Sequence, residues 1–302
     1  MKAIRTPDER FEGLPGYSFE PHYVHDLPGY HGLRGHYVDE GPRDAKEVFL
    51  CLHGEPTWSY LYRKMIPVFV DRGVRVIAPD WLGFGRSDKP VDPAAYTFHF
   101  HRDYMLELIR HLELQNITLV CQDWGGILGL TLPMSMPERF ERLLIMNTAL
   151  MLEKVESPVF ASWKQGITGP EDVALERVMK KYAPVLSDEE ALAYAAPYPS
   201  RASKAAVYRF PEMVGPTDDA EGIAVSQRAH AFWSERWQGE TFMAVGIKDD
   251  MLGPATMSWM RTVIRNCPAP LEVPEGGHFV QEHGETIARH ALDAFRIDAP
   301  DR

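Results

Sequence analysis

The chain has 302 residues, of which 45% are hydrophobic and 25% charged, and this composition is typical of a folded protein with a large buried core. Its formal net charge of -11 at pH 7 would repel the phosphates of nucleic acids and of anionic lipids, so neither is expected as a partner. Three cysteines form no disulfide framework, and no segment is long and apolar enough to span a bilayer. We therefore expect a cytoplasmic monomer that acts on a small neutral molecule.

The first half of the chain predicts an α/β core. Residues 17–24 and 33–38 have the pattern of an antiparallel pair of strands. The apolar runs at 48–52, 74–78 and 117–120 are predicted strands, and predicted helices at 60–71 and 102–112 lie between them. A further strand at 143–146 ends before Asn147. Near-continuous apolar strands that alternate with helices indicate a mostly parallel sheet with helices on both faces.

The pattern changes between about residues 150 and 237, where the strand signal disappears. Acidic, Ala-rich and aromatic stretches such as 189–194 favour several short helices there. The α/β pattern then resumes with strands at 242–247 and 271–273 and helices at 255–264 and 285–295. We therefore predict a core made of residues 1–149 and 238–302, with residues 150–237 inserted as a helical cap.

The most informative segment is Gln122-Asp123-Trp124-Gly125-Gly126, which follows a predicted strand and precedes a predicted helix. A sharp turn between a strand and a helix presents its central side chain at the top of the sheet, and that side chain is usually a serine. A serine that attacked a saturated carbon would leave an ether, whereas a carboxylate leaves an ester that water can cleave. Asp123 therefore favours displacement at saturated carbon followed by hydrolysis. The alternative is that Asp123 caps the next helix.

Two further residues complete a catalytic order. An α/β hydrolase carries its nucleophile, acid and histidine in that order, each on a loop at the carboxyl end of a strand. Asp123, Asp249 and His278 satisfy this order, and two glycines precede His278. Asp250 is an alternative acid, while the amide of Asn147, at the other place where this fold can carry the acid, cannot hold the required charge.

Donors to negative charge can also be proposed. The backbone N–H groups of Glu55, which follows the first parallel strand, and of Trp124 form a natural oxyanion hole, although the turn at Glu55 is also compatible with an ordinary connection. An indole N–H is a neutral donor that can hold a departing halide, and Trp124 is the first candidate. A second donor is needed because one N–H compensates poorly for the water that the anion loses. Spacing does not choose among the other tryptophans, which are Trp58, Trp81, Trp163, Trp233, Trp237 and Trp259.

Three motifs together resemble the haloalkane dehalogenases, in the branch typified by the dichloroethane-degrading enzyme. They are His53-Gly54-Glu55-Pro56-Thr57-Trp58, the run from Asp80 to Pro90, and the segment around Asp123. The resemblance covers most of the chain and implies Asp249 as the acid, Trp163 as the second halide donor, and Phe160, Ile127 and Met251 as pocket residues. Ile127 stands where the family has an aromatic residue, and the stretch from Leu150 to Trp163 is shorter than usual.

The sequence therefore predicts a cofactor-independent hydrolase that converts a small halogenated aliphatic substrate to an alcohol, a halide and a proton. One alternative is an epoxide hydrolase, for which Tyr182, Tyr194 and Tyr198 could protonate the epoxide. Another is a ligand-binding relative without turnover. No metal is expected, because His99 and His101 lack accompanying ligands, and the glycines at 83 and 85 do not form a nucleotide-binding fingerprint.

Overall fold

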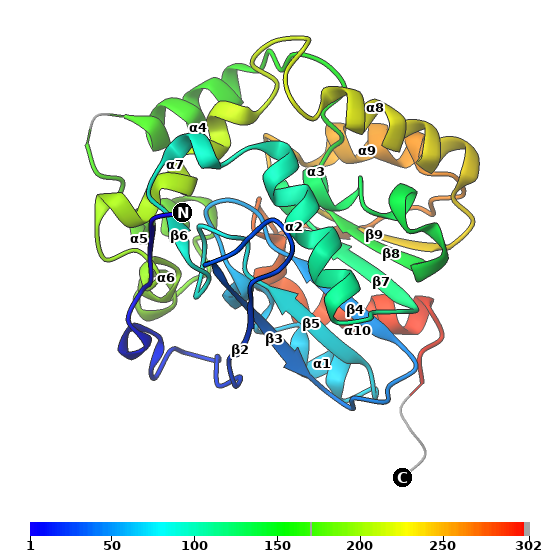
Figure 1. Ribbon diagram of the computed structural model, residues 1–302. Helices are drawn as coiled ribbons and strands as arrows, with labels where there is room; N and C mark the ends of the chain where they lie inside the picture. The colour runs from blue at the N-terminus through cyan, green and yellow to red at the C-terminus, as the bar shows by residue number, and fades with distance from the viewer. Residues whose placement is uncertain (170, 299–302) are drawn as a thin grey trace.

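A computed structural model describes residues 1–169 and 171–298, and its centre is an eight-stranded sheet (Figure 1). The spatial order of the strands is β10-β9-β8-β7-β4-β5-β3-β2. Their bounds are β2 His22–His25, β3 Arg34–Glu40, β4 Val48–Leu52, β5 Arg75–Pro79, β7 Ile117–Cys121, β8 Phe140–Met146, β9 Glu240–Gly246 and β10 Leu271–Val273. The strands from β10 to β5 are parallel, whereas β3 is antiparallel to both β5 and β2. A separate antiparallel pair joins β1 (Ala3–Ile4) to β6 (Lys89–Pro90).

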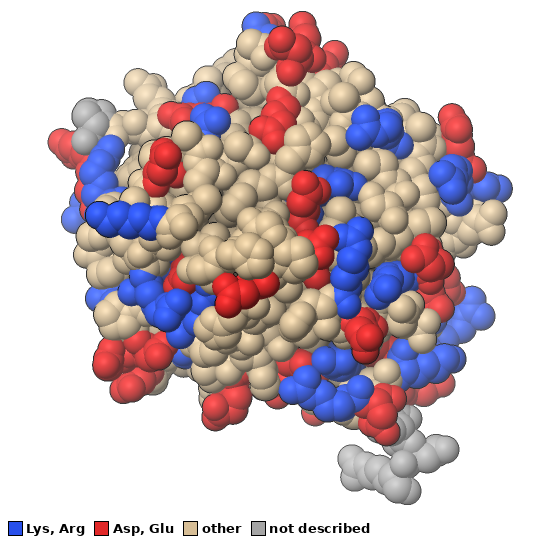
Figure 2. Space-filling model, in the orientation of Figure 1, with Lys and Arg blue, Asp and Glu red and all other residues tan. Residues whose placement is uncertain are grey.

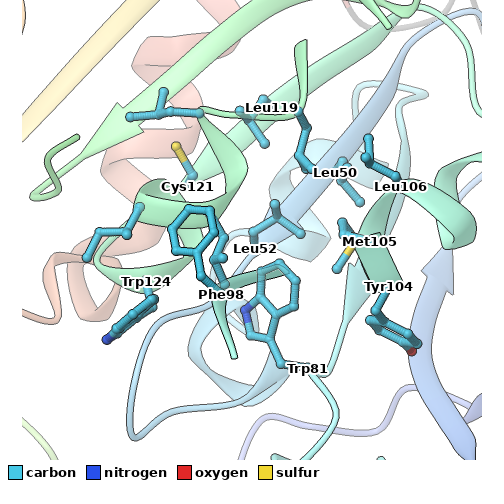
Figure 3. Close-up of a cluster of buried hydrophobic side chains, with 14 of the residues drawn as sticks. Leu50, Leu52, Trp81, Phe98, Tyr104, Met105, Leu106, Leu119, Cys121 and Trp124 are labelled. Atoms are coloured by element: carbon cyan, nitrogen blue, oxygen red, sulfur yellow. The ribbon is translucent and has the colours of Figure 1, made fainter. Parts of the chain in front are cut away.

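The central strands are apolar throughout because both of their faces are covered by helices. Leu50, Leu52 and Leu119 belong to one cluster with residues of α2 (Phe98–His111), α3 (Trp124–Gly129) and α9 (Pro254–Val263). Figure 3 shows these leucines with the side chains from α2 and α3. The alternate side chains, such as Phe49 and Val120, pack in a second cluster with α1 (Ile66–Val70) and α10 (Gly284–Ala294). This arrangement explains the near-continuous apolar runs, and the predicted fold class is confirmed.

A run of helices connects β8 to β9. It comprises α4 Pro158–Thr168, α5 Leu175–Tyr182, α6 Asp188–Ala195, α7 Ala205–Met213 and α8 Ile223–Ala231, followed by a π-helical turn at Phe232–Arg236. In Figure 1 these helices lie over one end of the sheet. No strand occurs among the described residues of this stretch, as the sequence predicted. Its treatment as a cap with bounds 150–237 stays a prediction, and residues 170 and 299–302 lie outside the described part of the chain.

The single helix predicted at 60–71 is wrong, because the structure has a 3-10 helix at Ser59–Tyr62 and then α1 at Ile66–Val70. Pro67 lies in the first turn of α1, where a missing N–H is tolerated, but it could not donate to a preceding turn in a continuous helix. Helix α2 begins four residues earlier than predicted, at Phe98, because the Thr97 hydroxyl accepts from the Phe100 N–H as an N-cap. The remaining 3-10 helices are Asp8–Phe11, Pro93–Ala95, Pro133–Ser135, Pro137–Arg139, Arg201–Lys204 and Val280–His283.

The surface is charged and mixed. On the face shown in Figure 2, acidic and basic side chains are interspersed rather than gathered by sign. Within residues 1–169 and 171–298, none of the helices has the length and apolar character needed to cross a bilayer.

Candidate active site

Five polar residues meet at one edge of the sheet. Glu55 follows β4, Asp123 follows β7, Asn147 follows β8, Asp249 follows β9 and His278 follows β10. These five strands are adjacent and parallel, so their carboxyl ends lie at the same edge. This is the edge at which open α/β sheets bind ligands.

Asp123 occupies a strained turn between β7 and α3. Its backbone has φ 50° and ψ -129°, a conformation that residues with side chains rarely adopt. Two bonds hold it there: the Asp123 N–H donates to Asn147 O over 3.0 Å, and the Thr148 hydroxyl donates to Asp123 O over 2.7 Å. A Cβ on Gly54 would lie 2.2 Å from Asp123 Oδ1, so only glycine fits opposite the carboxylate.

The Asp123 side chain makes no capping bond to α3, so the interpretation of this residue as a helix cap is wrong. Its Oδ1 accepts instead from the backbone N–H of Glu55 over 2.8 Å. Trp124 is the first residue of α3, and backbone N–H groups at a helix start have no acceptor within the helix. The Glu55 N–H therefore bonds the Asp123 carboxylate, and the Trp124 N–H, which follows Asp123 directly in the chain, has no acceptor within α3.

His278 lies between the two predicted carboxylates. Its Nε2 is 3.6 Å from Asp123 Oδ2, and its Nδ1 is 2.9 Å from Asp249 Oδ2. Burial alone would lower the pKa of His278, but the charges of Asp249 and Asp123 outweigh it and raise the pKa to about 10. With both carboxylates ionised, the imidazole is therefore a cation at neutral pH.

Asp249, not Asp250, contacts the histidine. Burial would raise the pKa of Asp249, but His278 and a hydrogen bond of 2.8 Å from Asn147 Nδ2 lower it to about 2. The backbone N–H of Met251 donates a further bond of 2.9 Å to its Oδ1. Asp250, the alternative left open by the sequence, is exposed. The Asn147 amide therefore binds the acid, Asp249. Asn147 itself follows β8, which is the other place where this fold can carry the acid.

A small cavity of about 110 Å³ lies above Asp123. Its wall is mainly apolar and contains all the residues predicted for the pocket. The lining residues are Glu55, Asp123, Trp124, Ile127, Ala149, Leu150, Met151, Val155, Ser157, Phe160, Trp163, Pro211, Val214, Met251, Leu252 and His278. A larger outer groove of about 1030 Å³ shares Trp163, Met251 and His278 with this cavity, so these three side chains stand between the two spaces.

The structure distinguishes the tryptophans, which spacing could not. Trp124 and Trp163 line the cavity and are 2% and 7% exposed. Three others donate their indole N–H elsewhere: Trp81 to His53 O, Trp233 to Leu130 O and Trp237 to Thr241 Oγ1. Trp58 is buried among the aromatic rings of the second core cluster, and Trp259 lies on the surface of α9.

The tyrosines considered for an epoxide hydrolase lie outside the cavity wall. Tyr194 is buried and donates to Glu282 Oε1 over 2.5 Å. Tyr182 packs edge-on against the outer side of Trp163, at 4.8 Å between ring centroids, and lines the groove. Tyr198 is buried and is likewise absent from the lining. None of the three is placed to protonate an oxygen bound above Asp123.

Two polar residues near the histidine were not predicted. The Gln122 amide Nε2 donates to His278 O over 3.0 Å and lies 3.3 Å from His278 Nε2. Gln281 Nε2 donates in turn to Gln122 Oε1 over 3.5 Å. Nothing in the sequence spacing singles out either glutamine, since their proximity arises only when β7 and the loop after β10 meet. No cluster of three His, Cys, Asp or Glu side chains suited to a metal ion occurs in the described ranges.

The fold and this site define an α/β hydrolase, and the comparisons with known proteins agree. The family model of the alpha/beta hydrolase fold matches residues 47–285. The haloalkane dehalogenase of Psychrobacter cryohalolentis is 41% identical, with 99% of this chain and 100% of that protein covered. That of Mycolicibacterium paratuberculosis is 35% identical, with 97% and 98% covered.

Among solved structures, the haloalkane dehalogenase DpaA from Paraglaciecola agarilytica matches with a TM-score of 0.95 and 49% identity, covering 97% of this chain and 98% of that one. The chain belongs to the haloalkane dehalogenase family of α/β hydrolases. The predicted family and class of enzyme, hydrolases acting on carbon–halide bonds, are confirmed, and the two alternatives are not favoured. DpaA is described as tetrameric, so the prediction of a monomer gains no support.

Proposed function

We propose that this chain hydrolyses short haloalkanes through an alkyl ester on Asp123. The observation that carries the proposal is the Asp123 carboxylate at the floor of a small apolar cavity, with two indoles in its wall and the His278–Asp249 pair beside it. An ionised carboxylate needs no base in order to attack. Asp123 displaces the halide from carbon, and the N–H groups of Trp124 and Trp163 hold the departing anion.

The charges around His278 support its action as a base only after the ester on Asp123 has formed. While Asp123 is ionised, its charge helps to hold His278 in the protonated form, which cannot act as a base. Formation of the ester removes the Asp123 charge, so the pKa of His278 falls and the imidazole releases a proton. The neutral imidazole then accepts a proton from water as the water attacks the ester carbonyl. Asp249 remains ionised and holds the ring through Nδ1.

The second half-reaction regenerates the enzyme. Water oxygen bonds to the ester carbon, and the Glu55 and Trp124 N–H groups stabilise the resulting oxyanion. The bond between that carbon and the alkoxy oxygen then breaks, and the alkoxide takes the proton from His278. The carboxylic acid left at Asp123 passes the second proton of the water to His278, which restores the Asp123 carboxylate and the protonated imidazole. The balance is one haloalkane and one water consumed, with one alcohol, one halide and one proton released.

The size of the cavity favours small substrates. An apolar cavity of about 150 Å³ can accommodate benzene, which has six carbon atoms. The cavity above Asp123 measures about 110 Å³, so it fits a substrate with fewer heavy atoms. We therefore propose halogenated alkanes of about two to four carbons as the preferred class. A cytoplasmic location and the segment 150–237 as a cap domain also remain proposals.

The test is a His278→Gln variant mixed with bromoethane. We expect one equivalent of bromide per active site and then arrest, with the protein heavier by one ethyl group on Asp123. Halide measurement, intact-mass spectrometry and peptide mapping follow the two half-reactions separately. His290→Gln, an exposed histidine of α10, is the matched control and should turn over normally. Sustained turnover by His278→Gln, or an adduct on another residue, contradicts the mechanism.

A further inference from the structure

The side chain of Glu55 lies in the cavity wall, yet the mechanism above uses only its backbone N–H. The residue is 3% exposed and shares the wall with Asp123, Trp163 and His278. Its Oε1 is buried and has no hydrogen-bond partner within the described part of the chain. Buried polar atoms nearly always have a partner, because an unpartnered one costs free energy. This oxygen therefore lacks the partner that a buried carboxyl usually has, and the residue that carries it lines the cavity.

Glu55 and Trp163 both line the cavity, and the indole N–H of Trp163 lies within hydrogen-bonding reach of the Glu55 carboxyl. Burial is the main reason that the pKa of Glu55 is raised well above its usual value, and the Asp123 charge raises it further. The cationic His278 and the indole N–H of Trp163 act in the opposite direction but do not compensate. Burial beside the Asp123 carboxylate therefore favours the neutral form of Glu55, whose O–H can donate.

The position of the indole determines where a halide would lie. An anion bound by the Trp163 N–H must occupy the side of the ring that the Glu55 carboxyl faces. An ionised carboxylate at this place would repel the anion and compete for the same N–H. A neutral carboxyl would instead turn its O–H toward the anion.

We propose that the Glu55 side chain is a third, proton-bearing donor to the halide, so that halide binding requires Glu55 to carry its proton. This inference rests on the proposed function, since it requires Trp124 and Trp163 to hold the halide. The only bond involved is the Glu55 O–H: where the pH exceeds the pKa of Glu55 in the empty site, departure of the halide is accompanied by loss of this proton to solvent, and the resulting carboxylate accepts from Trp163. The carboxylate then opposes rebinding of the halide.

Under this proposal, halide affinity depends on pH, because halide binding is linked to the protonation of Glu55. Because a bound halide favours the protonated form of Glu55, it raises the pKa of that carboxyl. Halide affinity should then be constant below the pKa of the empty site and fall about tenfold for each pH unit above it. Several other groups bear on this titration. Asp123 and His278 face Glu55 from the neighbouring loops, and Asp249 contacts the far side of the histidine. A negative charge on Glu55 also raises the pKa of the buried Tyr198 phenol.

His278 also loses a positive charge as pH rises, which by itself would weaken halide binding. The comparison is therefore made between His278→Gln and the double variant Glu55→Gln/His278→Gln. Glutamine keeps the shape of Glu55 and its backbone N–H but does not titrate. Chloride binding is measured by chlorine-35 NMR line broadening from pH 6 to 9.5, and thermal unfolding establishes that both variants are folded.

We expect the single variant to lose chloride affinity with the slope given above, and the double variant to vary by less than about twofold over the same range. Identical profiles for the two variants, whether flat or sloping, would overturn the inference. Trp163→Phe in the His278→Gln background separates this result from the proposed function. If Trp163→Phe leaves chloride affinity unchanged, the halide site itself is wrong; if it weakens binding while Glu55→Gln leaves the profile unaltered, only the role of Glu55 fails.

Discussion

Removal of the Arg63 guanidinium should destabilise the protein strongly, because it leaves a buried carboxylate without its main partner. Arg63 forms two parallel bonds to Glu282, of 2.8 and 2.7 Å, and a third of 2.7 Å to Glu190 of α6. The side chains of Arg63 and Glu282 are only 2% and 1% exposed. Loss of one member of such a pair costs about 3–5 kcal/mol. Lys64 Nζ still lies 2.8 Å from Glu282 Oε2, so we expect Arg63→Met to fall near the lower limit.

The expected change in melting temperature follows from the length of the chain. Unfolding entropy of about 2.1 cal/mol/K per residue gives about 0.6 kcal/mol/K for this protein. A loss of about 3–5 kcal/mol then lowers the melting temperature by about 5–8 °C. Scanning calorimetry and urea unfolding measure this change.

A double variant, Arg63→Met/Glu282→Gln, also removes the charge of the Glu282 carboxylate. Its free energy of unfolding should be higher than that of the single variant by about 1 kcal/mol or more. The reasoning fails if Arg63→Met unfolds within about 1 kcal/mol of the natural protein, or if the double variant is no more stable than the single one.

The pH dependence of this pair has a definite sign. Burial would raise the pKa of Glu282, but Arg63 and Lys64 outweigh it and lower the pKa below the usual 4.5. The pair therefore contributes its full stability above about pH 4.5 and loses it as the pH falls through the lowered value. The stability difference between the natural protein and Arg63→Met should shrink over that acid range.

Two further predictions concern the site. Asn147→Ala removes a donor to Asp249 and leaves the Gly246 N–H, which donates to Asn147 Oδ1 over 2.8 Å, unpaired; stability should fall by about 1–3 kcal/mol. Because the pKa of Asp249 rises in this variant, single-turnover kinetics should show slower ester hydrolysis with little change in halide release. Ile127→Ala should enlarge the cavity at a cost of about 2 kcal/mol in stability. It should also shift the ratio of kcat/KM values toward longer bromoalkanes. An unchanged ratio would show that Ile127 does not limit substrate size.

The sheet and the carboxylate elbow could be predicted because each depends on short-range patterns. An apolar run such as that of β7 identifies a strand buried on both faces, and the glycines after Asp123 identify a sharp turn. The order of nucleophile, acid and histidine then follows from the chain order of the strands. The helix predicted at 60–71 failed because the apolar pattern continues across Pro67, although the hydrogen bonding of a helix cannot.

The choice among tryptophans and between Asp249 and Asp250 could not be made from local patterns. Both depend on which side chains meet across different elements of the fold. Trp233 is excluded because its N–H meets Leu130 O, more than one hundred residues away in sequence, and Asp249 is selected by a bond from Asn147 at the end of another strand. The resemblance to a known family named Trp163 and Asp249 in advance, but it supplied no physical reason for either.

The residues that line the cavity come from two parts of the chain, and we assign the bond changes to one part and the choice of substrate mainly to the other. Seven of the sixteen lining residues lie outside the segment between β8 and β9, and these include Asp123 and His278, to which we assign the bond changes. The other nine come from the segment between β8 and β9, and apart from Ser157 and the Trp163 N–H their side chains are apolar. The core residues are held by ionic and backbone bonds that tolerate little change, whereas apolar contacts depend mainly on volume. Substitutions in the helical segment should therefore alter which haloalkane is accepted while leaving the sequence of bond changes at Asp123 intact.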